Sequence, residues 1–390
     1  MLPRMAHPFD DLTVEALRAR PLLKWRHYDP DVLPLWVADM DFPVADPIRE
    51  ALHAYADGDL FGYPEWTGLP GVREALCEHL ERTTGWRVEP DAVWLLPGTV
   101  PGLFGATKAF ASQGDGVLVP SPVYYPFRMA VERQGRVYQE ADLVETDAGW
   151  RLDEDALDAA IDPSTRLLML CHPHNPTGRS FDAGELEALA ERVLEHRLFV
   201  VSDELHADLT YDGGHVPFAT LSPELSRRTV TLLGPTKAFN LAGLRASFAI
   251  AEDPQVMERF QQAAFGYLLG APSASQAAAR AAYRQGGPWL EDTLAYLRAN
   301  RDHAAEAVAT RLPGVKMHAP EATYLAWLDF RATPIGDDPA AALLERGRLG
   351  LNDGATYGEA GRGFARLNFA TSRAVVDEAL DRIARVLAEA

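Results

Sequence analysis

Lys237 lies in the segment of this chain whose residue types most readily suggest chemistry. It ends the turn Gly234-Pro-Thr-Lys237, which directly follows the apolar run 229–233. An amine at the end of a buried strand is costly to desolvate unless it is paired or used chemically. Two earlier apolar runs also end in polar groups, one leading to Asn175 and the other to Asp203. We therefore expect an amine, an amide and a carboxylate to share one site.

This combination fits the needs of pyridoxal 5'-phosphate (PLP). That cofactor requires a lysine that forms a Schiff base with its aldehyde, and a carboxylate that keeps its pyridine nitrogen protonated. Lys237 and Asp203 would fill these two roles. Burial alone would raise the pKa of Asp203, but a pyridinium partner opposes that shift and keeps the carboxylate charged. Asn175 could donate to the phenolic oxygen of the ring, and Tyr124 could lie flat on the ring.

A phosphate site is predicted where the run 93–96 leads into Pro97-Gly98-Thr99-Val100-Pro101 and then into a helical stretch ending near residue 112. Glycine allows close approach of the backbone, and Pro101 suits the first position of a helix. The free N–H groups at such a helix start bind anions. Thr236 and Arg245 could complete the cup, because an arginine fork matches phosphate oxygens.

Strands and helices alternate along the chain. Apolar runs bounded by turn residues predict strands at Val93–Leu96, Gly116–Val119, Arg136–Glu140, Leu167–Leu170, Leu198–Ser202, Val230–Leu233 and Ala246–Ile250. Helical periodicity predicts helices at Val14–Arg20, Pro47–Ala56, Leu69–Thr83 and from Ser273 to about Leu312. A capping-box pattern at Asp182–Glu185 predicts a further helix that reaches Glu195. This alternation favours an α/β fold with a mainly parallel sheet and helices on both faces.

The predicted order of elements also suggests domains. Residues 46–285 are expected to form a large cofactor-binding domain, and residues 286–390 a smaller α+β domain. Residues 1–45 are rich in proline and are expected to pack with the small domain. Ligands of parallel sheets bind beyond the carboxyl ends of the strands, where Lys237 and Asp203 fall. We therefore expect the site in a cleft between the two domains.

Two longer segments carry a family resemblance: Leu35-Trp-Val-Ala-Asp-Met-Asp-Phe-Pro43 and Asp203-Glu-Leu-His206. With the residues above, they make the chain resemble fold-type I PLP enzymes of the class I/II aminotransferase superfamily over nearly its whole length. Within that superfamily the chain most resembles the cystathionine β-lyase-like C–S lyases typified by MalY and PatB. Many transaminases have tyrosine where His206 stands. Arg245, in contrast, is typical of transaminases, and lyase-like members vary there.

The resemblance implies a three-layer fold like that of aspartate aminotransferase and a homodimer. It implies that Tyr63, in Phe61-Gly-Tyr63-Pro, reaches the phosphate of the neighbouring subunit. His206 is expected to join the cofactor site. Arg366, in Ala365-Arg366-Leu-Asn-Phe-Ala, is expected to grip the α-carboxylate of an amino-acid substrate, with Val37 and Asn175 nearby.

The expected activity is carbon–sulfur β-elimination. L-cystathionine or related cysteine S-conjugates would be cleaved to pyruvate, ammonia and a thiol, with Lys237 removing the α-proton. One alternative is an aminotransferase of an L-amino acid, which would use the same residues. A less favoured alternative is a regulatory binding protein on the same fold, since the MalY type is said to bind a transcription regulator. Taken singly, Lys237 could be a surface lysine and Asp203 a helix cap; together, their order and placement argue against coincidence.

Composition excludes several partners. The net charge of −19 argues against nucleic acid and anionic membranes, and no apolar run approaches the roughly 20 residues that span a bilayer. The first residues lack the apolar region of a signal peptide. Cys77 and Cys171 form neither a disulfide framework nor a metal pattern, which favours the cytoplasm. His172, His174 and His206 are a weak zinc signal, and we expect no metal.

Overall fold

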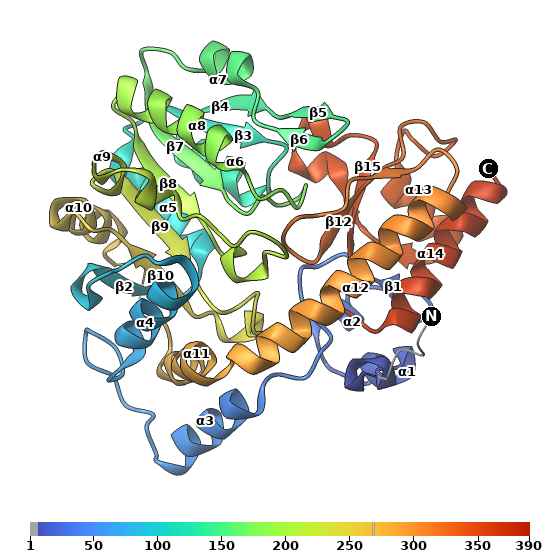
Figure 1. Ribbon diagram of the computed structural model, residues 1–390, viewed down its shortest axis with the longest axis horizontal. Coiled ribbons are helices and arrows are strands. Elements are labelled where there is room, and N and C mark those ends of the chain that lie inside the picture. Colours follow the sequence, from blue (N-terminus) through green and yellow to red (C-terminus); the bar gives the residue numbers. More distant parts are fainter. Residues whose placement is uncertain (1–6, 267, 269) are drawn as a thin grey trace. The chain divides into compact units, whose positions relative to one another are not determined.

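The computed structural model describes residues 7–266, 268 and 270–390. The chain divides into two compact units (Figure 1). The large unit holds Val44–Asn175 and Arg179–Asp292, and the small unit holds the residues before Val44 together with Pro176–Gly178 and Thr293–Ala390. The domain boundaries predicted from the sequence, at residues 45 and 285, remain a prediction.

The large unit is built on one mixed sheet. In the described residues its strand order is β2 (Val93–Leu96), β10 (Ser247–Ile250), β9 (Thr229–Leu233), β8 (Phe199–Asp203), β7 (Thr165–Cys171), β3 (Gly116–Ser121) and β4 (Val137–Asp142). The pairs from β9 to β4 are parallel, whereas β10 runs antiparallel to both β2 and β9. All the predicted strands are confirmed, and the sheet is mainly parallel as expected.

Burial on both faces explains why these strands read as continuous apolar runs. Leu167 and Met169 of β7 belong to a core shared with helices α5 (Thr99–Phe110), α6 (Pro126–Glu132) and α10 (Pro254–Ala264). The alternate residues Leu168 and Leu170, which point to the other face, are fully buried as well. The sheet is therefore the middle layer of the large unit.

The large unit contains further helices. They are α3 (Asp46–Asp57), α4 (Val72–Thr84), α7 (Glu154–Ala160), α8 (Ala183–Glu195), α9 (Pro223–Ser226) and α11 (Ser273–Gln285), and a hairpin joins β5 (Val144–Thr146) to β6 (Gly149–Arg151). The predicted capping box is confirmed, because the Glu185 N–H donates to Asp182 Oδ1 at 3.0 Å and the Asp182 N–H donates to Glu185 Oε2 at 3.0 Å.

The helical stretch predicted from Ser273 to about Leu312 is confirmed, with one interruption. It is two helices, α11 and α12 (Gly287–Arg311), which are separated at Gly286. Pro288 explains the break, because proline has no N–H to donate to the carbonyl of Arg284, four residues earlier in α11. A side chain at Gly286 would also meet Phe239 Cε1 at 2.6 Å, so only glycine fits this corner.

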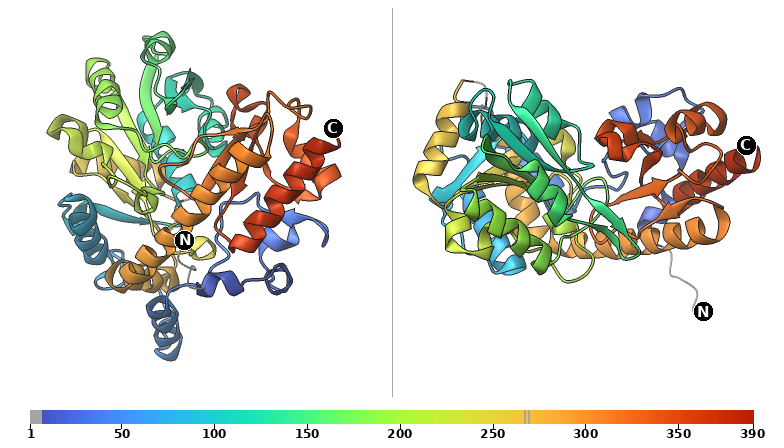
Figure 2. Two further views of the ribbon diagram at one scale, coloured as in Figure 1. Left: turned by 45° about the vertical axis from the view of Figure 1, so that its right-hand side comes forward. Right: turned by 90° about the horizontal axis from the view of Figure 1, so that it is seen from above.

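The small unit has an antiparallel sheet. Its order, among the described residues, is β11 (Lys316–Met317), β12 (Leu325–Asp329), β15 (Phe364–Asn368) and β14 (Asn352–Asp353). Helices α13 (Pro339–Gly347) and α14 (Arg373–Ala388) pack against each other (Figure 2). The N-terminal segment carries α1 (Val14–Arg18), α2 (Leu23–Arg26) and β1 (Leu33–Pro34), which pairs in parallel with β13 (Leu349–Gly350).

A bilayer-spanning helix, which would need about 20 apolar residues, is absent from the described part of the chain.

Candidate active site

Lys237 lies in the turn that follows β9. The five residues of β9 are all buried, and the turn packs so closely on β10 that a side chain at Gly234 would lie 2.6 Å from the Ala246 carbonyl oxygen. Thr236 is buried, whereas Lys237 itself is partly exposed. The strand and the tight turn therefore hold the lysine at the carboxyl edge of the sheet.

Asp203 is the last residue of β8, and its register places it beside Leu232 of β9 and Cys171 of β7. Its carbonyl accepts from the His172 N–H at 3.0 Å, and its Oδ1 accepts from the Leu205 N–H at 3.2 Å. The side chain is 7% exposed. Asp203 is thus fixed through both its backbone and its carboxylate.

Burial raises the pKa of Asp203 to about 7, and desolvation is the main cause. The neighbouring Glu204 carboxylate raises the pKa further, whereas the Leu205 N–H, the Lys237 ammonium and a hydrogen bond from Thr99 lower it. Thr99, Asp203 and Lys237 are therefore brought together by three different elements. A cation facing Asp203 would favour its charged form.

Asn175 and Tyr124 meet in the same region of the large unit. The Tyr124 N–H donates to the Asn175 carbonyl oxygen at 3.2 Å. Asn175 is buried, and Tyr124 is half-buried with its ring edge-on to Tyr125 at a centroid distance of 5.0 Å. Tyr124 also packs on the core beneath α5 and α6. An amide and a flat aromatic surface are thus available beside the carboxyl ends of the strands.

The predicted phosphate segment forms the start of α5. Gly98 precedes the helix with φ 148° and ψ 161°, a conformation that side-chain-bearing residues rarely adopt. Thr99 and Val100 then open the helix, and Thr99 is buried. The expected place of Pro101 is wrong, because it is the third helical residue and not the first. Proline is tolerated there because N–H groups of the first turn have no partner within the helix.

Other predicted cofactor residues differ in exposure. His206 is buried at the start of the short helix Ala207–Leu209. Arg245 is exposed and adopts φ 55° after the short helix Ala242–Leu244. Tyr63 is fully exposed. No described hydrogen bond or ion pair joins Arg245 or Tyr63 to the group around Asp203, so their roles stay predictions.

The small unit holds the predicted substrate residues. Arg366 lies in the middle of β15 and is 3% exposed. Its Nη2 donates to the Trp36 carbonyl oxygen at 2.9 Å, and its guanidinium lies 5.3 Å from the centre of the Tyr357 ring. Asn368 Nδ2 donates to the carbonyl oxygens of Val37 and Asp39, each at 2.7 Å. Side chains of β15 therefore hold the backbone of the segment 36–39, and Arg366 and Val37 share this small scaffold of β15 and the segment 36–39.

Sequence reasoning missed how this scaffold is anchored. Lys24 Nζ lies 2.7 Å from Asp41 Oδ2, with both side chains 1% exposed, and Trp25 Nε1 donates to Asp41 Oδ1 at 2.7 Å. Asp41 stands inside the segment 35–43 that carries the family resemblance, and Asn368 stands two residues after Arg366. The nearness of Asp41 and Asn368 to these two motifs was the feature of the sequence that could have pointed to them.

A second buried polar group, around Glu204, was also missed. Glu204 is 1% exposed and lies 2.7 Å from His215 Nε2 through its Oε2. The His172 ring lies tilted against the His215 ring at a centroid distance of 4.8 Å, and burial lowers the pKa of His172 well below its usual range. Burial likewise lowers the pKa of His174 to about 3. His172 and His174 are therefore neutral near pH 7.

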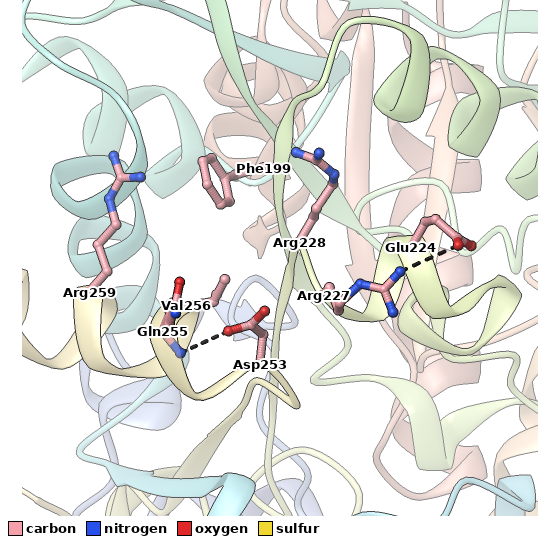
Figure 3. Close-up of a pocket in the computed structure, with 8 residues that line it drawn as sticks. All are labelled: Phe199, Glu224, Arg227, Arg228, Asp253, Gln255, Val256 and Arg259. Atoms are coloured by element: carbon pink, nitrogen blue, oxygen red, sulfur yellow. Dashed lines mark hydrogen bonds and ion pairs between the residues drawn. The ribbon is translucent and has the colours of Figure 1, made fainter.

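A cavity of about 420 Å³ lies elsewhere in the large unit (Figure 3). Its wall includes Phe199, the first residue of β8, whereas Asp203 is the last, so the cavity opens at the opposite edge of the sheet. Its charged groups are already engaged: Arg259 Nε donates to the Ala109 carbonyl oxygen at 2.7 Å, and Arg227 lies 3.4 Å from Glu224. This cavity is not part of the candidate site.

Comparison with known proteins shows the family of this chain. Residues 30–383 match the family model described as aminotransferase class I and II. The chain belongs to the class I and II aminotransferase family.

Among its relatives are several lyases. Cystathionine beta-lyase PatB of Bacillus subtilis strain 168 is 41% identical, over 92% of this chain and 93% of the relative. Cystathionine beta-lyase of Corynebacterium glutamicum is 35% identical, over 96% of this chain and 99% of the relative. Protein MalY of Escherichia coli K12 is 31% identical, over 89% and 90% respectively. The predicted resemblance to the MalY and PatB branch is confirmed.

Solved structures support the fold. OvoB superposes with a TM-score of 0.91 at 38% identity, over 95% of this chain and 97% of that chain. Cystalysin from Treponema denticola, whose structure contains a PLP cofactor, superposes with a TM-score of 0.91 at 29% identity, over 99% and 100%. The predicted α/β fold of the aminotransferase kind is confirmed.

Proposed function

We propose that this chain is a PLP-dependent carbon–sulfur β-lyase that cleaves L-cystathionine or related cysteine S-conjugates to pyruvate, ammonia and a thiol. The observation that carries the proposal is Asp203, a buried carboxyl at the end of a central strand, with Lys237 and Thr99 acting on it. Relatives named cystathionine beta-lyase, 35% and 41% identical over nearly the whole chain, support the choice of reaction.

The residues present fit PLP. A carboxyl with a pKa near 7 gains from a cationic partner, and a protonated pyridine nitrogen is such a partner. The N–H groups that open α5 suit the phosphate. The residues that would hold the cofactor are Lys237, Asp203, Asn175, Tyr124, His206, Gly98, Thr99, Val100, Thr236 and Arg245, with Tyr63 supplied by a second subunit.

When bound, PLP withdraws electrons from the α-carbon of an amino acid. The amine of Lys237 acts as the general base that takes the α-proton. Asp203 keeps its negative charge at the pyridine nitrogen, and Tyr124 offers its ring as a flat packing surface. Together with the cofactor, Asp203 and Tyr124 would make the C–H of the α-carbon more acidic, and Lys237 would place a base close to it.

Arg366 binds the α-carboxylate of the substrate, because a guanidinium matches a carboxylate in a planar fork. Its hydrogen bond to the Trp36 carbonyl limits the directions in which the guanidinium can point. After the α-proton is lost, the Cβ–S bond breaks and sulfur leaves with the bonding electrons, to be released as a thiol. Water then converts the three-carbon remainder to pyruvate and ammonia.

The same chain is proposed to act in the cytoplasm as a homodimer. Leu60, Phe61, Tyr63 and Trp66 form an exposed apolar segment, with exposed fractions of 51%, 70%, 105% and 100%. Large apolar groups gathered in one short segment are typical of an interface with another protein. Burial of this segment against a second copy would bring Tyr63 toward the neighbouring subunit's cofactor, as the family resemblance implies.

The test is pyruvate release from L-cystathionine by PLP-loaded protein with no keto acid added. Sustained multiple turnover is expected, and Lys237→Ala should lower the rate by at least about 10³-fold, because it removes both the cofactor-binding amine and the base. Transfer of the amino group to the cofactor without pyruvate release would make the protein a transaminase. Substantial turnover by PLP-replete Lys237→Ala would refute the role of this lysine.

A further inference from the structure

Glu204, the residue after Asp203, is the centre of a buried polar cluster in the large unit. Ser202 Oγ donates to Glu204 Oε1 at 2.7 Å, and the Phe218 N–H donates to the same oxygen at 3.1 Å. The other oxygen, Oε2, lies 2.7 Å from His215 Nε2. Ser202, Glu204 and Phe218 are at most 1% exposed and His215 is 7% exposed. A carboxylate is therefore held in the interior with a partner for each oxygen.

This cluster is tied to the backbone of Asp203. The Glu204 N–H donates to the Leu232 carbonyl at 2.7 Å, which continues the ladder between β8 and β9. His172, whose N–H donates to the Asp203 carbonyl, places its ring 4.8 Å from the ring of His215. Because few atoms separate the two residues, a change in the charge of Glu204 changes the electrostatic environment of Asp203.

Resting on the proposed function, we propose that Glu204 is a positioning residue for the cofactor's pyridine nitrogen. Its buried negative charge, held by Ser202 and His215 on the residue next to Asp203, helps to keep a proton at the contact between Asp203 and that nitrogen. The Glu204 carboxylate is bound by Ser202, His215 and Phe218. We therefore assign it no direct contact with the substrate or the cofactor.

Several groups act on this pair of carboxylates. Asp203 faces the Lys237 ammonium, the Thr99 hydroxyl and the Leu205 N–H, all of which favour its charged form. Glu204 opposes them and raises the pKa of Asp203. His172 contacts His215 through tilted rings and is neutral because burial lowers its pKa. Glu204 is thus the negative group that offsets Lys237 at this position.

A structural role alone does not explain a glutamate here. Glutamine has the same shape and could accept from Ser202 and from the Phe218 N–H, while its amide could donate to His215. It would do so without the desolvation cost of a buried charge. The charge itself is therefore the property to test.

The test is the titration of Asp203 in the PLP-free protein, followed by NMR of carboxyl-labelled aspartate and assigned with Asp203→Asn. The wild-type midpoint is expected near pH 7. Glu204→Gln should lower this midpoint by about one pH unit, because one nearby negative charge is lost. Ser202→Ala is the matched control: it removes one hydrogen bond from Glu204 but keeps the charge, and should not lower the midpoint.

An unchanged midpoint in Glu204→Gln, or an equal fall in Ser202→Ala, would overturn the proposal.

If Glu204→Gln does not fold, the double variant Glu204→Gln/His215→Gln carries the same expectation, since two amides can hydrogen-bond to each other. A second readout is the pyridine ¹⁵N resonance of labelled PLP, whose proton should be lost at lower pH in Glu204→Gln. A wild-type protein that fails to bind PLP would refute the proposed function, whereas the titration of Asp203 would still decide the role of Glu204.

Discussion

At the scale of single residues, the charge of Asp203 is the property on which the candidate site depends. The fold buries this carboxyl at a cost, since its pKa rises to about 7 from an ordinary value near 4. A cationic ligand offsets that cost, so the empty protein is less stable than it could be. Function and stability therefore place opposite demands on the same side chain.

We predict that Asp203→Asn stabilises the PLP-free protein at pH 8 while lowering turnover on the order of 10²–10³-fold. Asparagine is never charged, whereas folded wild type must ionise Asp203 above about pH 7. The unfolded chain ionises this residue near pH 4, so the stability of wild type relative to the variant falls from pH 4 to 7 and is then constant. The full difference is up to roughly 4 kcal/mol.

Urea unfolding of both PLP-free proteins at pH 4, 6 and 8 checks this prediction. Asp302→Asn serves as a control, because that carboxylate is 58% exposed and removing its charge involves no buried group. A stability difference between wild type and Asp203→Asn that does not change with pH would contradict the assignment.

At the scale of elements, the strands are the part of the fold that local patterns predict well. Strands buried on both faces appear as uninterrupted apolar runs, and each of those predicted in the large unit is present. Helix boundaries were less accurate. The start of α5 lies at Thr99 because Gly98 turns the chain directly into the helix, and the stretch after Ser273 breaks at Gly286 because Pro288 cannot continue it.

The entry into α5 gives a prediction at this scale. Gly98→Ala should weaken PLP binding by about tenfold or more and destabilise the protein by about 1–3 kcal/mol, because φ 148° is strained for any residue with a side chain. The N–H groups of Thr99 and Val100 would then point away from their present direction. Equilibrium dialysis against PLP and urea unfolding measure the two effects.

Gly184→Ala is the matched control, since Gly184 lies inside α8 and a side chain there meets only Asp182 Oδ1, at 3.5 Å. This change should leave PLP binding unaltered and slightly raise stability. Equal loss of PLP in both variants would mean that the conformation of Gly98 is not what matters.

At the scale of the whole molecule, the exposed segment around Tyr63 is the surface through which we propose that two copies associate. Four large apolar side chains lie exposed between Leu60 and Trp66. A net charge of −19 keeps chains apart in general, so association through this segment would require a specific fit. The proposed homodimer would supply that fit and would bring Tyr63 to the cofactor site of the second subunit.

We predict that Tyr63→Phe lowers PLP affinity about tenfold, because one hydrogen bond to a charged phosphate is lost. If the tyrosine comes from the second subunit, mixing Tyr63→Phe with Lys237→Ala should restore one normal site per hybrid dimer. That site combines Lys237 of one chain with Tyr63 of the other. Unchanged PLP affinity in Tyr63→Phe, or no recovery on mixing, would count against this placement.

By itself, the sequence determined the class of fold, the family and the residue types at the ends of the central strands. Those signals are local: an apolar run, a turn, and one polar residue at the end. Only the tertiary structure decided how Asp203 behaves, because Thr99 and Lys237 reach it from different elements and the surrounding core desolvates it. It likewise decided that His215 holds Glu204 and that Asn368 holds the backbone at Val37, contacts that span 11 and 331 positions in the chain. No local pattern encodes such contacts, since packing brings the partners together.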